Sequence, residues 1–294
     1  MSQQSRKSIA AKLISEHAHF FSCPICTSPM VFENNTTLVC TEGHSYDLAK
    51  KGYIHLLSQS IDTKYDKSLF QSRQRIAESG FFTPLVEAIA ILIENERLNE
   101  LTAILDAGCG EGSHLAQIQE YVAGNTIGFG ADISKEGIQL AASNLSNAIW
   151  IVADLAKTPL ASQKFPFILN ILSPSNYSEF DRLLTDDGLL IKVVPNSAYL
   201  QELRELFYEN REAFDNEKTM SRFQEKFDLI KTQAVKYHVR LEQPLLNDLV
   251  KMTPLSWSAN EAKRKQVSDM SDMDITIDLN ILVGRKKVEN GSQI

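Results

Sequence analysis

Three glycines in the segment Asp106–Gly112, with the sequence DAGCGEG, constrain the fold more strongly than any other part of the chain. A short apolar run from Thr102 precedes them, and an amphipathic helical segment follows before a second strand-like run ends at Asp132. Glycine has no Cβ, so this loop can turn tightly and a ligand can lie against its backbone. N–H groups at the start of the next helix attract a carboxylate, and Asp132 can accept hydrogen bonds from both hydroxyls of a ribose. The stretch therefore predicts a nucleotide-like ligand.

The spacing of these residues narrows the class of ligand. A dinucleotide-binding G-x-G-x-x-G loop would need glycine where Ser113 stands, and a nucleoside triphosphate would need a G-K-[ST] sequence that the chain lacks. The pattern D-x-G-x-G-x-G resembles the first motif of class I S-adenosylmethionine-dependent methyltransferases. A glycine-rich turn in another α/β protein is the competing interpretation, and the acid at the end of the next strand favours a methyltransferase. The candidate cofactor-binding residues are then Asp106, Gly108, Gly110, Gly112 and Asp132.

Apolar runs alternate with amphipathic segments from Thr102 onward, which is typical of an α/β fold with a mostly parallel, doubly wound sheet. We expect strands near 102–106, 126–131, 148–152, 165–172 and 188–194, and helices near 113–122, 135–145, 177–184 and 198–211. A helix near 84–95 precedes them, and an extended run at 229–241, a short helix near 244–250 and a strand at 274–284 follow. Ligands of such sheets bind beyond the carboxyl ends of the strands. This rule places Asp154 and the segment Asn170–Pro174 beside the glycine loop.

Three of the four cysteines lie in the first 40 residues, in the pattern C-x2-C-x13-C-x3-H formed by Cys23, Cys26, Cys40 and His44. Two tight knuckles joined by a short hairpin can bring three thiolates and an imidazole to a tetrahedral ion, which suits Zn²⁺. Four protein ligands make such a site structural, because no position is left for water. Unligated buried cysteines are the alternative, and the paired spacing argues against them. So small a module lacks a core of its own, and the metal would hold it together.

The 294 residues, 43% of them hydrophobic, suffice for a large domain and a small one. We expect a zinc-binding module at 20–60, a connecting and partly helical segment at 61–84, and a catalytic domain at 85–294. The longest apolar stretch, near Leu85 to Ile93, is too short to span a bilayer, and the first residues lack the apolar region of a secretory signal. These features predict a cytoplasmic protein without membrane insertion. The net charge is −7, but residues 1–79 carry nine basic and seven acidic side chains, which makes this end the basic one.

Taken together, these motifs resemble the 23S ribosomal RNA guanine-N1 methyltransferases of the RlmA type. The resemblance is carried by the four zinc-ligand positions, DAGCGEG, and DISK at Asp132–Lys135, and it extends to GHSYDLAKKGYIHLL, NILSPSNY at Asn170–Tyr177 and MTPLSW at Met252–Trp257. It implies a class I methyltransferase fold with an amino-terminal zinc module that recognises 23S rRNA. It further implies methylation of guanine 748, or of guanine 745 as in the sister branch, in hairpin 35 of domain II. The guanine-748 branch is linked to tylosin-type macrolide resistance, and members of the family are thought to form homodimers.

The resemblance also implies roles for individual residues. Gly110 and Glu111 would border S-adenosylmethionine, and the aromatic rings of Phe82 and Tyr199 would approach the cofactor, whose sulfonium favours an aromatic face. An ordinary aromatic residue of the core is an equal alternative for each of these two rings. Asp154 would meet the adenine amine, although a helix N-cap is an equal alternative for it. Guanine N1 carries a proton and takes part in base pairing, so the target must be unstacked and the proton must leave. The sequence identifies no general base, and Asp154, Glu111 and water stay open as the proton acceptor. The candidates that hold the base edge are Asn170, Ser173 and Pro174, and a simple strand end is the alternative for the last two.

RNA affinity would come from basic side chains that contact phosphates. The candidates are Arg6, Lys7, Lys50, Lys51, Lys64, Lys67, Arg73 and Arg75, and a solvated surface charge is the more common role for any one of them. Two other functions stay open at this point. A small-molecule methyltransferase would have the same glycine-rich core, and a zinc-dependent RNA-binding protein could carry an inert one.

Overall fold

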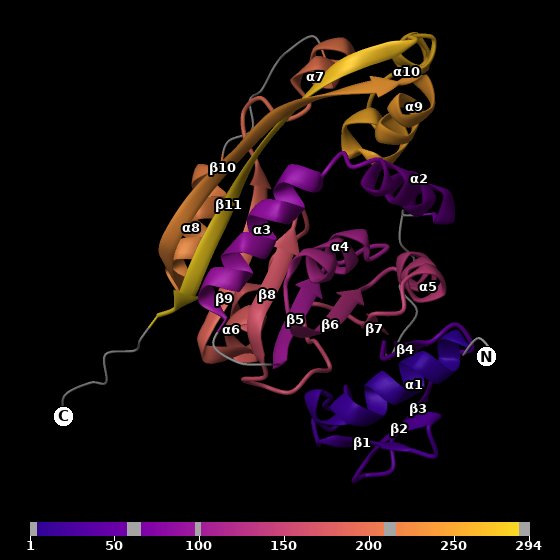
Figure 1. Ribbon diagram of the computed structural model, residues 1–294, viewed down its shortest axis with the longest axis vertical. Coiled ribbons are helices and arrows are strands. Elements are labelled where there is room, and N and C mark those ends of the chain that lie inside the picture. Colours follow the sequence, from indigo (N-terminus) through magenta and orange to yellow (C-terminus); the bar gives the residue numbers. More distant parts are fainter. Residues whose placement is uncertain (1–4, 58–65, 98–100, 209–215, 288–294) are drawn as a thin grey trace, which may run out of the picture.

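The computed structural model describes residues 5–57, 66–97, 101–208 and 216–287. An eight-stranded sheet runs through its centre in the order β10-β11-β9-β8-β5-β6-β7-β4 (Figure 1). The strands are β4 (Tyr53–His55), β5 (Leu101–Ala107), β6 (Asn125–Asp132), β7 (Ala148–Val152), β8 (Phe165–Ile171), β9 (Leu184–Pro195), β10 (Phe227–Glu242) and β11 (Asp272–Lys286). Strands β4 to β9 pair in parallel, whereas β11 runs antiparallel to both β9 and β10. The expected α/β fold with a mostly parallel sheet is confirmed.

Helices cover both faces of this sheet. The apolar residues of α3 (Thr83–Glu96), α4 (Ser113–Tyr121) and α5 (Lys135–Asn144) form one buried cluster with the strands, and α7 (Gln201–Phe207) extends it. On the opposite face, α1 (Arg6–His17), α6 (Tyr177–Leu183) and α8 (Glu217–Lys226) pack on the second cluster. Because apolar side chains fill both faces, the central strands are buried almost throughout, as their uninterrupted hydrophobic runs predict.

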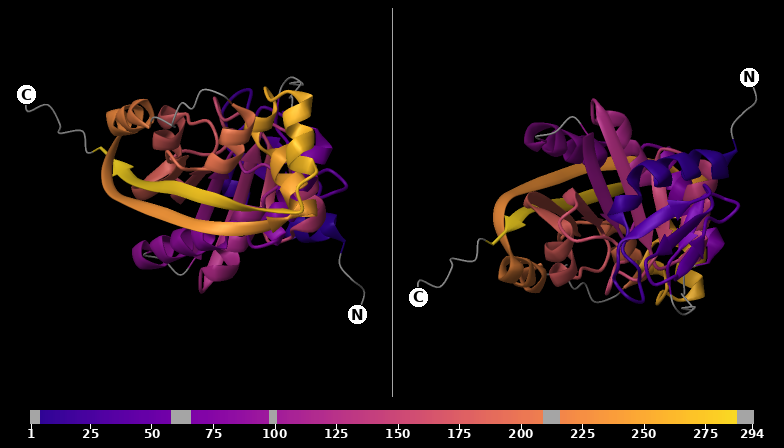
Figure 2. Two further views of the ribbon diagram at one scale, coloured as in Figure 1. Left: turned by 90° about the horizontal axis from the view of Figure 1, so that it is seen from above. Right: turned by 90° about the horizontal axis from the view of Figure 1, so that it is seen from below.

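Two further helices lie over the carboxyl ends of the strands. Helix α2 (Lys67–Glu78) packs against α9 (Gln243–Met252) and also contacts α4 and α5, beyond the carboxyl ends of the parallel strands (Figure 1). The short turn η2 (Pro254–Ser256) and helix α10 (Glu261–Ser268) follow α9. The strands that flank α9 and α10, β10 and β11, run side by side as a long curved pair (Figure 2). One helix that precedes the parallel strands in the sequence and one that follows them therefore cover the edge of the sheet at which a ligand is expected to bind.

The zinc-binding module forms a small antiparallel sheet of β1 (Met30–Glu33), β2 (Thr37–Cys40) and β3 (Ser45–Asp47), after the turn η1 (Ala18–Phe20). Its core is continuous with that of the large sheet. The ring of Phe20 lies 4.6 Å from that of Phe129 and 5.2 Å from that of Phe165, measured between ring centroids. β4, within the range predicted for the module, pairs with β7 at the edge of the large sheet. The module therefore shares its hydrophobic core with the larger sheet.

One helix differs from the sequence prediction. The helix expected at 198–211 begins at Gln201, because Leu200 has a left-handed backbone (φ 50°), and it ends at Phe207; residues 209–215 lie outside the described part. The connecting segment expected at 61–84 is partly helical, as predicted, because residues 67–78 form α2. The start of α2 is capped by the Asp66 carboxylate, which accepts from the Leu69 N–H at 2.8 Å, and residues 58–65 lie outside the described part. Within the described ranges, no single helix has the length and hydropathy of a membrane span, and α2 and α3 pass that test only as a pair bent by 76°.

Candidate functional site

A cavity of about 740 Å³ lies at the carboxyl rim, between the glycine loop, the loop after β8 and helix α2. Most of the side chains and glycines predicted for the site meet there. Those that line the cavity are Phe82, Gly108, Glu111, Asp132, Asp154, Ser173 and Pro174. Tyr199 is buried, 9% exposed, in the adjoining core, and Asp106 is buried at the end of β5, directly before the loop. The cavity therefore lies at the rim where the rule that ligands bind beyond the strand ends predicts a ligand.

The glycine loop has the tight backbone that its composition predicts. Gly108, Gly110 and Gly112 all have positive φ values, 90°, 58° and 81°, a region that side chains disfavour. A Cβ on Gly112 would lie 2.3 Å from the Trp150 ring, and a Cβ on Gly108 would lie 2.4 Å from Ser173 Oγ. The loop is anchored by Asp132, whose carboxylate accepts from the Gly110 N–H at 2.9 Å and from the Ser134 N–H at 2.8 Å.

Three acids gather around this loop, and burial affects the pKa of each. Burial, with the nearby charges of Asp132 and Glu111, raises the pKa of Asp106 to about 8. Burial also raises the pKa of Glu111, against the opposing effect of Arg73. It raises the pKa of Asp132, against the hydrogen bonds from the backbone of Ser134 and Gly110. Such a cluster favours a ligand that brings positive charge.

The aromatic and polar walls of the cavity come from several elements. Phe82 lies at the turn before α3, which the Tyr237 hydroxyl fixes by donating to the Phe81 carbonyl at 2.8 Å. Its ring packs edge-on against His114, 4.9 Å between centroids. Burial lowers the pKa of His114 to about 4, so the imidazole is neutral, and its Nε2 has no hydrogen-bond partner among the described residues. Sequence reasoning missed His114, although its place one residue into α4, directly after the glycine loop, is a usable signal.

Asp154 follows β7 and lines the cavity in a turn of its own. Its Oδ1 accepts from the Ala156 N–H at 2.8 Å, which closes a local turn rather than capping a helix. The same carboxylate borders the cavity on the side of β6 and β7. The predicted contact with the adenine amine is compatible with this position.

The loop after β8 is built around Asn170. This side chain is fully buried and donates to the carbonyl oxygens of Ala107 at 2.8 Å and Pro174 at 3.0 Å, and to Ser173 Oγ at 2.6 Å. Leu172, at the turn itself, has a left-handed backbone (φ 51°), a strained conformation typical of functional loops. Asn170 therefore lies behind the loop and orients it, while Ser173 and Pro174 border the cavity.

Helix α2 supplies a wall that the sequence did not predict. Arg73 lines the cavity, and its charge acts on Glu111, Asp132 and His114. On the outer side of the same helix, Arg75 forms a two-pronged ion pair with Asp248 of α9, with N–O distances of 2.6 and 2.5 Å. Of the eight basic residues predicted as phosphate contacts, Arg75 is thus held in an ion pair, Arg73 faces the cavity, and Lys64 lies outside the described residues.

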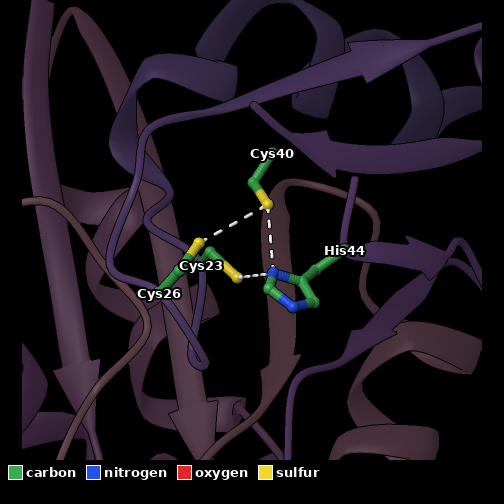
Figure 3. Close-up of side chains that lie close together, drawn as sticks. All are labelled: Cys23, Cys26, Cys40 and His44. Atoms are coloured by element: carbon green, nitrogen blue, oxygen red, sulfur yellow. Dashed lines mark hydrogen bonds between the residues drawn. The ribbon is translucent and has the colours of Figure 1, made fainter. Parts of the chain in front are cut away.

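The four predicted zinc ligands converge in the amino-terminal module (Figure 3). His44 Nδ1 lies 3.6 Å from Cys23 Sγ and 3.4 Å from Cys40 Sγ, and Cys26 Sγ lies 3.6 Å from Cys40 Sγ. All four ligand atoms fall within 4.8 Å of one another. A tetrahedral zinc ion with bonds of about 2.0–2.3 Å separates its ligand atoms by about 3.4–3.8 Å. The donor set and its spacing therefore fit a structural Zn²⁺.

Comparison with known proteins agrees with this geometry. Residues 21–60 match a zinc-ribbon family model described as "RlmA, N-terminal", and residues 104–188 match one described as "Methyltransferase domain". A solved methyltransferase from Aquifex aeolicus, described as SAM-dependent, is similar with a TM-score of 0.43 and 15% identity, over 57% of this chain and 92% of its own.

Two relatives match along most of their length. A Bacillus subtilis protein named "Putative 23S rRNA (guanine-N(1)-)-methyltransferase YxjB" is 42% identical over 273 residues, which is 90% of this chain and 97% of the relative. The 23S rRNA (guanine(748)-N(1))-methyltransferase of Streptomyces fradiae is 28% identical, over 81% of this chain and 86% of its own. The chain combines a methyltransferase domain that uses S-adenosylmethionine with a ribbon that binds zinc. It belongs to the RlmA-type family of 23S rRNA (guanine-N1) methyltransferases.

Proposed function

We propose that this protein transfers the methyl group of S-adenosylmethionine to N1 of guanine 748, or of guanine 745, in hairpin 35 of domain II of 23S rRNA. The main support is the 42% identity to a relative of that name across 97% of the relative's length. The guanine-748 relative supports the choice of position. Methylation there would change susceptibility to tylosin-type macrolides.

The cofactor side of the cavity is suited to a cationic methyl donor. Asp132 keeps a lone pair on each carboxylate oxygen after its two backbone hydrogen bonds, and these can meet the ribose hydroxyls. The Phe82 ring presents an aromatic face, and the three acids around the glycine loop complement positive charge. The donor itself supplies an activated methyl group when bound, so the protein's contribution is alignment.

The base side of the cavity is the loop after β8. Ser173 and Pro174 border the same space as the glycine loop, so a base held by them would lie beside the methyl donor. The bound donor would supply the methyl group, and the proton of N1 would have to pass to water or to an acid of the cavity wall, Asp154 or Glu111. The target has to leave its helical stack to enter the cavity, which favours a base in a loop or at a helix end.

The zinc ribbon would guide the RNA toward this cavity. Exposed lysines near the ribbon, Lys50 and Lys51, remain candidates for phosphate contacts, with Lys51 also donating to Gln139 at 3.2 Å. Contacts of this kind weaken as salt rises, because phosphate binding releases counterions.

The test is methyl transfer in vitro to a domain II fragment that contains hairpin 35, followed by primer extension, which stops at an N1-methylated guanine. We expect one stop at position 748 or 745, and none when adenine replaces that guanine. Transfer only to a quinone-like small molecule would refute the proposal. So would the absence of any cofactor binding by calorimetry, which would identify an inert RNA-binding protein.

A further inference from the structure

A lysine is buried in the middle of the sheet, directly behind the loop that borders the base side of the cavity. Lys192 lies on β9 and is only 5% exposed. Its Nζ donates to Asn170 Oδ1 at 2.6 Å and to the Ser173 carbonyl oxygen at 2.7 Å. Burial lowers the pKa of Lys192 to about 8, and among the described residues no carboxylate opposes this effect. The side chain is thus still mostly protonated at neutral pH, and in the absence of a paired carboxylate its two hydrogen bonds are what offset the cost of burying the charge.

The ammonium determines which way the Asn170 amide points. Lys192 Nζ and the Ser175 hydroxyl both donate to Oδ1, at 2.6 and 2.8 Å. The carbonyl oxygens of Ala107 and Pro174 can only accept, and they face Nδ2. An amide turned over would place its NH2 group against the ammonium and its oxygen against two carbonyls. Only one orientation of Asn170 is therefore compatible with its neighbours.

The orientation of Asn170 in turn determines what Ser173 offers to the cavity. Ser173 Oγ accepts from Asn170 Nδ2 at 2.6 Å and donates its hydrogen to the Ala107 carbonyl at 2.9 Å. A hydroxyl has one donor and two acceptor positions, so one lone pair remains. Ser173 lines the cavity and contacts Gly108 of the cofactor loop. This lone pair is therefore the hydrogen-bonding capacity that Ser173 has left for a ligand in the cavity.

An acceptor at this position distinguishes the groups on the edge of guanine. N1 must point at the methyl carbon, so its two neighbours, the carbonyl O6 and the exocyclic 2-amino group, are the ones that the protein can hold. A lone pair attracts the amino group and repels the carbonyl oxygen. Among bases with a reactive N1–H, inosine lacks the 2-amino group.

We propose that Lys192 is a positioning residue that, through Asn170, fixes Ser173 Oγ as the acceptor for the 2-amino group of the target guanine. This inference rests on the proposed function and adds a specificity determinant to it.

The test compares hairpin-35 RNA carrying guanosine or inosine at the target position. For the wild-type protein we expect kcat/KM to be about ten- to a hundredfold higher for guanosine, the usual effect of one good hydrogen bond. In Lys192→Met, which keeps the aliphatic stem, and in Ser173→Ala, this ratio should fall below about threefold, with cofactor affinity unchanged within about twofold. Ser173→Thr keeps the hydroxyl and should keep the ratio. Val194→Ala, two residues along the same strand and equally buried, tests general damage to β9 and should also keep it.

A wild-type ratio near one, or an unchanged ratio in Lys192→Met, would overturn the inference. If Lys192→Met does not fold, Ser173→Ala still tests the acceptor on which the inference depends, because Ser173 is partly exposed and its loss leaves the core intact; an unchanged ratio in Ser173→Ala would overturn the inference. A wild-type protein that methylates neither RNA would instead refute the proposed function.

Discussion

The cofactor loop and the loop on the base side of the cavity touch at Gly108 and Ser173. A Cβ on Gly108 would lie 2.4 Å from Ser173 Oγ and 2.8 Å from Ser173 Cβ. No real Cβ approaches another heavy atom so closely, so the absence of a side chain at Gly108 is what lets the two loops meet. In the proposed function this contact would bring the methyl donor close to the target base, so glycine is needed at position 108 for its small size as well as for its backbone angle.

The first prediction concerns this contact. Gly108→Ala should weaken cofactor binding at least about tenfold, because the new methyl group displaces Ser173 and the positive φ adds about 1–2 kcal/mol of strain. Isothermal titration calorimetry measures the affinity. Gly43→Ala is the matched control, since Gly43 has a similar φ of 82° but no atom within 4 Å of the added Cβ. It should keep cofactor affinity within about threefold.

A double variant separates the clash from the strain. Gly108→Ala with Ser173→Gly removes both clashing atoms and should recover most of the cofactor affinity, while turnover on RNA stays low because the Ser173 hydroxyl is gone. Equal affinities of the single and double variants would show that backbone strain alone accounts for the loss.

The second prediction concerns the release of a proton from Asp106 when the cofactor binds. The pKa of Asp106 is raised to about 8, so at pH 7 this carboxyl is mostly protonated in the free protein. A bound sulfonium favours the ionised form and lowers that pKa, so binding should release up to about one proton at pH 7. The affinity should then rise as pH increases from 6 to 8, since less work is needed to remove the proton. Calorimetry in two buffers with different ionisation enthalpies measures the release.

Two comparisons make this prediction specific. S-adenosylhomocysteine has no sulfonium charge and should release fewer protons. Asp106→Asn should remove most of the release. Equal proton release by both ligands in the wild-type protein would contradict an electrostatic origin.

The third prediction concerns zinc. Cys23→Ser should abolish stoichiometric zinc, and because the ribbon shares its apolar core with the large sheet, the melting temperature of the whole protein should fall. Elemental analysis and calorimetric melting measure the two effects. Cys109→Ala, a buried cysteine outside the cluster, should keep one zinc per chain. A separate early transition, with the main transition unmoved, would show that the ribbon unfolds independently.

The fourth prediction concerns the ion pair between Arg75 of α2 and Asp248 of α9, the helix that packs against α2. Arg75→Ala should lower the free energy of unfolding by about 1–2 kcal/mol and speed cofactor release. The Asp248 carboxylate is only 12% exposed, and without Arg75 its remaining hydrogen-bond donor among the described residues is Ser72. The predicted loss of stability is modest because the Arg75 side chain is 51% exposed, so solvent screens its interaction with Asp248. Lys265→Ala breaks an exposed pair with Asp269 and should cost about 0.5 kcal/mol or less. Chemical denaturation measures the free energy of unfolding, and stopped-flow measures the rate of cofactor release. Similar effects of both variants would show that the ion pair of Arg75 and Asp248 does not hold α2 and α9 over the cavity.

Much of this architecture could be predicted because its signals are local. The glycine spacing, the acid at the end of β6 and the paired cysteines each require a particular backbone or ligand geometry. The positions of strands follow from their apolar runs, and the rule that ligands bind at strand ends located the cavity.

The rest depends on contacts between distant segments. Helix α2 is polar and charged in sequence, so nothing local shows that Arg73 faces a cavity and Arg75 faces α9. Asn170 looked like a residue that holds the base, yet its amide is occupied by contacts with Ala107, Pro174 and Lys192. The signal that could have been used is Lys192 itself, a single cation within the apolar run LLIKVVP.

The pairing of β4 with β7 also determines which fragments of this protein can be expressed separately. Strand β4 covers the outer side of β7, with Tyr53, Ile54 and His55 opposite Trp150, Ile151 and Val152. A fragment that began after the ribbon would expose a fully apolar strand with unpaired backbone groups, which is a template for association with other chains. The catalytic half, expressed alone, should therefore aggregate rather than behave as a smaller soluble enzyme.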